Sequence, residues 1–243
     1  MSFITDNVRA ARARIEAAAR EAGRDPGEIR LLAATKMNGP EAVREAVAAG
    51  VDLCGENRVQ EFLEKSRANA YAPCGVHFIG HLQKNKVKYL VGEVDLIHSV
   101  DSVELMEAIH RRAVSRGVVQ DVLLEVNIGG EISKSGAAPE ALPELLAAAA
   151  DCPGLRVRGL MTIPPMERIP GENRNYFRRM FQLFVDIRGK KYDNVLMTEL
   201  SMGMSGDYED AVRCGATIVR LGTALFGPRN YDRQEAPPHG ILG

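Results

Sequence analysis

The chain has 243 residues, and its 31 Lys and Arg against 32 Asp and Glu give a formal net charge of -1. This charge excludes strong bulk attraction to nucleic acid or to an anionic membrane. The apolar content of 45% is typical of a globular protein, and the longest apolar runs are far too short to span a bilayer. A chain of this length forms one or two domains, and we expect a single domain over residues 1–243.

The N-terminal segment combines arginines with an apolar stripe at helical spacing. Its acids Asp6, Glu16 and Glu21 distinguish it from a transit peptide, so we expect a helix of the mature protein. The apolar face of this helix is predicted at Val8, Ala11, Ile15, Ala18 and Ala22.

The cysteines carry no motif that indicates a metal or a disulfide framework. The four of them are widely spaced along the chain, without a C-x-x-C pair, and the histidines form no H-E-x-x-H. We therefore expect reduced thiols, a cytoplasmic location and no metal site.

After the first helix, short apolar runs alternate with helix-type runs to the end of the chain. The predicted strands span residues 29–35, 52–56, 76–81, 94–100, 119–128, 155–163, 195–202 and 216–226. The predicted helices between them lie near residues 40–49, 58–71, 84–91, 102–115, 139–150, 174–188 and 207–214. Right-handed βα units in this number close most simply into a single α/β domain, a (β/α)8 TIM-type barrel with an extra N-terminal helix. A doubly wound open sheet is the alternative.

The barrel prediction locates the candidate site, because barrel enzymes place their chemistry at the C-terminal ends of the strands. The first predicted strand ends at Lys36. A lysine in an apolar setting can have a lowered pKa and form a Schiff base with an aldehyde. Alternatively, it extends its ammonium to solvent at the barrel mouth without a chemical role.

Two turns rich in Gly, Ser and Thr follow the seventh and eighth predicted strands, at residues 201–207 and 222–223. The corresponding loops form the recurrent phosphate site of this fold, where free N–H groups face the anion. We therefore predict a phosphate site there, with plain turns as the alternative, in which Asp207 is simply a helix N-cap.

Arg220 lies within the last predicted strand, between Val219 and Leu221. If it points into the barrel, an obligate cation is buried and needs a partner. One candidate is a heterocyclic nitrogen, as in pyridoxal 5′-phosphate (PLP) sites, where Asp or Arg commonly faces the pyridine nitrogen. The alternative is an ion pair with Glu56 or Glu125. A lysine, a phosphate site and a buried arginine together are what PLP requires.

The chain resembles a known family, the PLP homeostasis or YggS/PROSC-like proteins. The matching segments are ATK at 34–36, GENRVQE at 55–61, HFIGHLQKNK at 77–86, EVNI at 125–128, SKSG at 133–136, GLMTI at 159–163, LSMGMSGD at 200–207, RLGT at 220–223 and FG at 226–227. They occur in family order from about residue 29 to residue 231.

The resemblance implies a barrel like the N-terminal domain of alanine racemase, with PLP held on Lys36. It also implies a role for each matching residue: the phosphate is held by Ser201, Ser205, Gly222 and Thr223, Arg220 faces the ring nitrogen, and the pocket is lined by Asn57, Met161 and His81.

The chain also departs from the family pattern. Many relatives carry a second lysine two positions after the PLP lysine, where this chain has Asn38, and a Trp where it has Val76. Lys134 matches another family lysine, with a solvated loop charge as the simpler interpretation.

The resemblance implies a monomeric carrier or buffer in vitamin B6 homeostasis that supplies PLP to apo enzymes. The net charge predicts no nucleic-acid or membrane partner. A cation at Arg220 disfavours protonation of the pyridine nitrogen, which weakens PLP as an electron sink. Alanine racemases also take a catalytic tyrosine from a second domain, which this chain is not expected to have.

Two alternatives remain. The first is a weakly active PLP-dependent amino-acid racemase. The second is a barrel that binds a phosphorylated metabolite without PLP, with Lys36 as a counter-ion.

Overall fold

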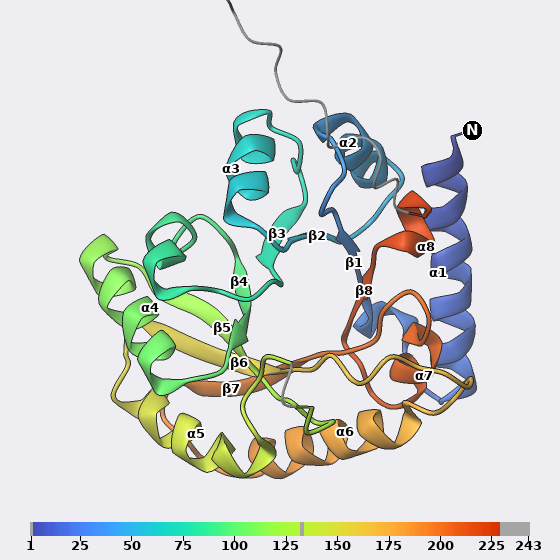
Figure 1. Cartoon of the computed structure of the whole chain (residues 1–243). Helices are drawn as coiled ribbons and strands as arrows, with labels where there is room; N and C mark the ends of the chain where they lie inside the picture. The colour runs from blue at the N-terminus through green and yellow to red at the C-terminus, as the bar shows by residue number, and fades with distance from the viewer. Residues whose placement is uncertain (1, 132–133, 229–243) are drawn as a thin grey trace, which may run out of the picture.

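The computed structural model describes residues 2–131 and 134–228, so Ser133 and Tyr231, which fall in the region of family resemblance, lie outside the described residues. Eight parallel strands form a closed barrel in the order β1 to β8, and β8 pairs with β1. Helices surround the strands on the outside (Figure 1). The (β/α)8 prediction is therefore confirmed, and the open sheet is excluded.

The elements follow the predicted alternation of strand and helix. The strands are β1 (Arg30–Ala34), β2 (Leu53–Glu56), β3 (Gly75–Phe78), β4 (Leu96–Val100), β5 (Gln120–Glu125), β6 (Leu155–Met161), β7 (Val195–Ser201) and β8 (Ile218–Leu221). The α-helices are α1 (Phe3–Glu21), α2 (Pro40–Ala48), α3 (Val59–Arg67), α4 (Val103–Arg116), α5 (Leu142–Ala150), α6 (Arg174–Arg188), α7 (Tyr208–Arg213) and α8 (Thr223–Phe226). Short 3-10 helices are η1 (Pro26–Glu28), η2 (Lys84–Tyr89) and η3 (Pro139–Ala141).

Three local predictions were wrong. The predicted strand 216–226 ends at Leu221, because the chain turns at Gly222 and continues as α8. The predicted helix 84–91 is the 3-10 helix η2. Ala22 is exposed beyond the end of α1, and Ala19 takes its place on the buried face.

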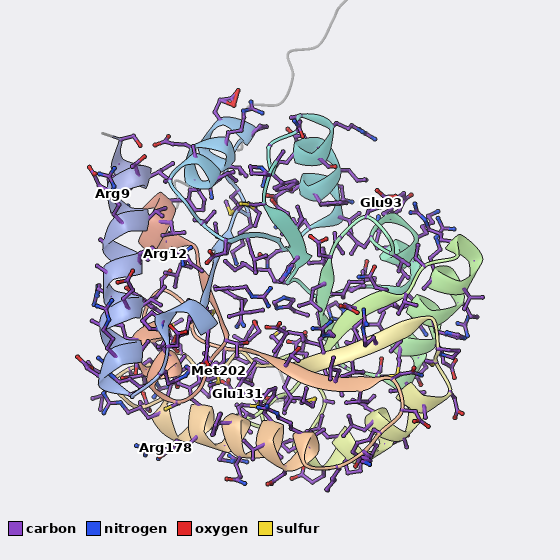
Figure 2. The ribbon with its side chains drawn as sticks, turned by 180° about the vertical axis from the view of Figure 1, so that it is seen from behind. Arg9, Arg12, Glu93, Glu131, Arg178 and Met202 are labelled. Atoms are coloured by element: carbon purple, nitrogen blue, oxygen red, sulfur yellow. The ribbon has the colours of Figure 1, made fainter. Side chains whose placement is uncertain are left out.

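The alternation of side chains along the strands separates two apolar clusters. One fills the lumen of the barrel and consists of Leu32, Ala34, Leu53, Ile79, Leu96, Leu123, Met161 and Ile218. The other packs between the strands and the surrounding helices. Figure 2 shows the side chains that project from both faces of the strands. A residue's phase along its strand therefore decides whether it can reach the lumen.

Helix α1 closes the outer layer beside β8 and β1. It lies along α7 and α8 (Figure 1), and Asn7 on α1 donates a 3.0 Å hydrogen bond to the carbonyl of Leu225 in α8. In the part of the chain that the structure describes, no helix combines the length and the hydropathy that crossing a bilayer requires.

Strands β6 and β7 pack closely at Gly159, where the register between them shifts. A Cβ added at Gly159 would lie 1.7 Å from the carbonyl oxygen of Glu199, a backbone atom that cannot rotate away. We expect Gly159→Ala to lower the free energy of unfolding by about 3 kcal/mol, measured by urea denaturation. Gly206→Ala is the control, because a Cβ there meets nothing within 4 Å. Equal midpoints for both variants would contradict the packing.

Candidate functional site

Lys36 follows β1 at the mouth of the barrel and is half-buried. Leu32 and Ala34 face the lumen, whereas the hydroxyl of Thr35 bonds Glu56 on the outer side of the sheet. Lys36 is thus in phase with the lumen residues. Asn38 donates a 3.0 Å hydrogen bond from Nδ2 to the carbonyl of Lys36, which steadies the turn.

Arg220 projects into the lumen from β8, in phase with Ile218. Its Nη1 donates to the hydroxyl of Ser201 at 2.6 Å, and its Nη2 donates to the carbonyl of Thr162 at 2.8 Å. The side chain is 4% exposed, and burial lowers the pKa of its guanidinium to about 10, so it stays charged at neutral pH.

The predicted ion-pair alternatives for Arg220 differ in their outcome. Glu56 is turned to the outer side of the barrel, where Lys65 pairs with it. Glu125 faces the lumen side, and its charge and that of Arg220 attract each other, but among the described residues no carboxylate forms an ion pair with Arg220 within 4.0 Å. Burial first, and then Asp101, raises the pKa of Glu125 to about 7.

Two histidines continue the hydrogen bonds of Arg220 across the lumen. The Ser201 hydroxyl lies 3.1 Å from Nδ1 of His98, and Nε2 of His98 lies 2.9 Å from Nδ1 of His77. Burial lowers the pKa of His98, and burial together with Arg30 lowers the pKa of His77 to about 3. Both rings are therefore neutral, and they add no competing cation to the lumen.

The loops after β7 and β8 meet at the start of α8. Ser205 accepts hydrogen bonds at its hydroxyl from the backbone N–H of Gly222 at 3.2 Å and of Ala224 at 3.1 Å. Thr223 is exposed beside them. The structure therefore brings together three of the four predicted phosphate residues and places the fourth, Ser201, deeper in the lumen on Arg220.

Asp207 holds the loop after β7. It occupies the N-cap position of α7, but its carboxylate makes no capping bond into that helix. The carboxylate accepts instead from the backbone N–H of Met204 and from Nδ2 of Asn173, both at 2.7 Å.

The remaining pocket residues lie on the adjoining strand ends. Met161 is fully buried in the lumen. Asn57 is half-buried at the end of β2, and its Oδ1 has no hydrogen-bond partner among the described residues. His81 is exposed, and it lines a surface pocket together with Asn57.

Lys134 stands apart from this group, in the loop after β5. Its Nζ donates to the carbonyl of Pro164 at 2.8 Å and pairs with Glu131 at 2.5 Å. It ties the loops after β5 and β6 together and is more than a solvated charge.

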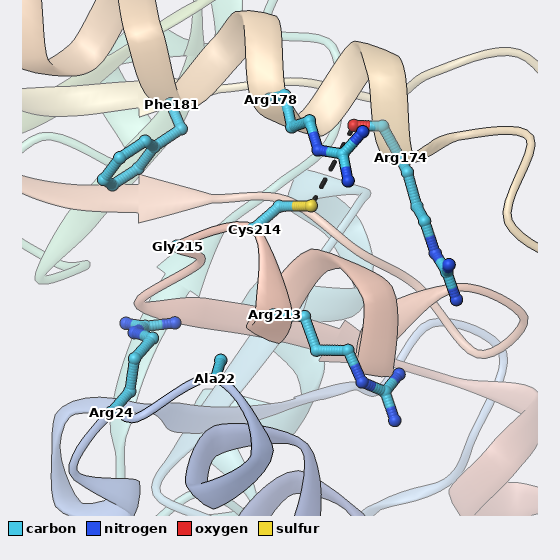
Figure 3. A pocket seen from close by; sticks show the side chains of 8 residues that line it. All are labelled: Ala22, Arg24, Arg174, Arg178, Phe181, Arg213, Cys214 and Gly215. Atoms are coloured by element: carbon cyan, nitrogen blue, oxygen red, sulfur yellow. Dashed lines mark hydrogen bonds between the residues drawn. The ribbon is translucent and has the colours of Figure 1, made fainter.

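A pocket elsewhere is lined by arginines and Cys214 (Figure 3). Arg24 there donates to the carbonyls of Val212 and Ala216, and Arg213 pairs with Glu21. Arg174 pairs with Asp210 at 2.9 Å. These three guanidinium groups already have partners, and none of the predicted site residues lines this pocket, so it is not the candidate site.

Residues 7–230 match the family model described as the alanine racemase N-terminal domain. A relative from Aquifex aeolicus named pyridoxal phosphate homeostasis protein is 49% identical over 218 residues, covering 90% of this chain and 95% of that protein. This chain belongs to the pyridoxal phosphate homeostasis protein family.

Solved structures agree with the family assignment. A protein from Bifidobacterium adolescentis superposes with a TM-score of 0.85 at 40% identity, covering 92% of this chain and 94% of that chain. PipY of Synechococcus elongatus, solved with PLP bound, gives a TM-score of 0.72 at 33% identity, covering 88% and 100%.

Sequence reasoning did not identify His77, His98 and Thr162 as neighbours of Arg220. The two-residue alternation of the strands was the available signal, since His77 and His98 share the lumen phase of their strands. The bonds themselves join β3, β4, β7 and β8, which only the closed barrel brings together.

The buried histidines predict a pH dependence of stability. His77 is neutral in the native state down to pH about 3 but is protonated in the unfolded chain below its usual pKa of 6.5. The unfolded state therefore binds more protons between these values, and stability falls as pH decreases, by about 1.4 kcal/mol per pH unit for this group. We expect His77→Gln to reduce the slope of unfolding free energy against pH by that amount between pH 5 and 6, measured by urea denaturation. Parallel slopes for the variant and the wild type would contradict the buried neutral histidine.

Proposed function

We propose that this protein binds PLP at the mouth of its barrel, with Lys36 as the amine that holds it. The observation that carries the proposal is the buried guanidinium of Arg220, which bonds only neutral groups in the described residues and faces the lumen below Lys36. A buried cation in that position favours a ligand that presents a neutral acceptor, such as an unprotonated pyridine nitrogen.

The other residues fit the same ligand. Gly222, Thr223 and Ser205 lie together at the start of α8, where the hydroxyl groups of Ser205 and Thr223 can donate to a phosphate. Asn57 offers an amide whose Oδ1 has no protein partner in the described range. Bound PLP supplies an electrophilic aldehyde that reacts reversibly with a primary amine. Lys36 provides that amine, and Met161 lines the lumen as a fully buried apolar side chain.

The site favours holding the cofactor over turning over a substrate. Arg220 stays charged at neutral pH, and it therefore opposes the ring protonation that would make PLP a strong electron sink. A racemase would also need a second acid–base group at the mouth. Of the tyrosines in the described residues, the buried Tyr71 and Tyr208 and the half-buried Tyr176 and Tyr192 pack in the outer core, and Tyr89 is exposed on η2.

The proposal therefore assigns the chain to PLP homeostasis as a carrier or buffer. Relatives named for that role, from Aquifex aeolicus and other bacteria, support the assignment, as does the PLP-bound PipY structure. We further propose that the protein acts as a cytoplasmic monomer that supplies PLP to apo enzymes. Size-exclusion chromatography with light scattering tests the monomer, and transfer of PLP to an apo enzyme tests the supply.

Borohydride trapping tests the site. The protein mixed with PLP is expected to show a visible absorbance band that borohydride removes, leaving a reduced pyridoxyl adduct on Lys36 in the peptide mass map. Lys36→Met should abolish the band and the adduct. Lys134→Met is the matched control, because Lys134 is bonded in the loop after β5, and it should retain the band. An adduct on another lysine, or no band with excess PLP, would refute the proposal. A phosphorylated metabolite bound by an ion pair gives no adduct.

A further inference from the structure

A cluster of buried charged and polar side chains lies directly behind Lys36, on the outer side of the barrel. Glu56 at the end of β2 is fully buried, and its Oε1 accepts hydrogen bonds from Nζ of Lys65 at 2.7 Å, from the hydroxyl of Tyr71 at 3.0 Å and from the hydroxyl of Thr35. The side chain of Lys65, from α3, is only 4% exposed. The cluster therefore joins α3 to the ends of β1 and β2.

Lys65 has three acceptors for its three ammonium protons. Besides Glu56, its Nζ donates to the carbonyl of Thr35 at 2.8 Å and to Oε2 of Glu61 at 3.2 Å. An ammonium with all three donors engaged and almost no exposed surface is not available to a ligand at the mouth. One of its three bonds instead goes to the backbone next to Lys36, at the carbonyl of Thr35.

The cluster holds the main chain on both sides of Lys36. Lys65 binds the carbonyl of Thr35, the preceding residue, and the backbone N–H of Met37, the following residue, donates to Oε2 of Glu61 at 2.7 Å. Met37 has a φ of 63°, a backbone conformation that residues other than Gly rarely adopt. Such a conformation persists only where the surroundings fix it, and the two flanking bonds do so here.

Stability alone does not account for this arrangement. Removing an ammonium and a carboxylate from water costs several kcal/mol each, and well-packed apolar side chains of the same volume are often as stabilising as a buried ion pair. The cluster specifies one geometry for the end of β1.

We propose that Lys65, with Glu61, is a positioning residue that fixes the backbone of Thr35 and Met37 and so presents the Lys36 amine to the lumen. This inference rests on the proposed function, because the presented amine is the one that takes up PLP. Lys65 and Glu61 act through the backbone and do not touch the ligand.

The test compares three variants by the rate at which the apo protein takes up PLP, followed by visible absorbance well below the melting temperature. Lys65→Met removes the bond to Thr35, and Glu61→Leu removes the bond to Met37. Tyr71→Phe is the matched control, since it removes a hydrogen bond from the same cluster but none from the backbone beside Lys36. Hydrogen exchange of the Met37 amide provides a readout that needs no PLP.

We expect Lys65→Met and Glu61→Leu to slow PLP uptake by about tenfold or more, because small displacements of a reacting group have large effects on rate. Both should also speed exchange at Met37. Tyr71→Phe should stay within about twofold of the wild-type uptake rate whatever its melting temperature. If Lys65→Met fails to fold, Glu61→Leu alone tests the inference, because the side chain of Glu61 is 19% exposed and less deeply buried than Lys65.

Two results would overturn the inference alone: wild-type uptake rates in Lys65→Met and Glu61→Leu, or an equal slowing in Tyr71→Phe, which would show that the cluster acts only through stability. A wild-type protein that takes up no PLP would overturn the proposed function and the inference together.

Discussion

The lumen of this barrel is organised around the buried charge of Arg220. Arg220 has its guanidinium inside an apolar barrel, and the structure satisfies it with a hydroxyl and a backbone carbonyl, while Glu125 attracts it from a greater distance. The neutral His98 and His77 extend this network, and neither ring adds a charge of the same sign. We propose that this buried cation favours a ligand with a neutral acceptor at one end. In this proposal the anionic part of the ligand binds at the start of α8, outside the lumen.

The two faces of the sheet have different roles at the end of β1. The lumen face carries the groups proposed to meet the ligand, whereas the outer face carries Glu56 and Lys65, which hold the backbone. Burial raises the pKa of Glu56, and the nearby ammonium of Lys65 opposes that rise. Each of the two groups therefore depends on the other to stay charged. Because Thr35 and Lys36 are adjacent in sequence and opposite in phase, the positioning groups stay out of the ligand's space.

Much of this was predictable from the sequence, for identifiable reasons. The eight short apolar runs that alternate with helix-type runs predicted the barrel, and the C-terminal ends of those runs marked Lys36 and the loops near Arg220 as candidates. The end of β8 was not predictable, because the apolar residues after Gly222 suit a strand as well as a helix. The sequence allowed Glu56 as an ion-pair partner for Arg220, but it did not show on which side of β2 the Glu56 side chain lies. Gly55 faces the lumen, so Glu56 faces outward and cannot reach Arg220. The contacts from Lys65 to Thr35 depend on the packing of α3, which no local pattern records.

The proposed site can be examined in a crystal structure of the protein soaked with PLP. We expect covalent density at Nζ of Lys36, the phosphate against Ser205, Gly222 and Thr223, and the ring nitrogen within hydrogen-bond distance of Arg220. PLP bound at another surface, or a ring whose nitrogen faces a carboxylate and not Arg220, would refute the proposed site.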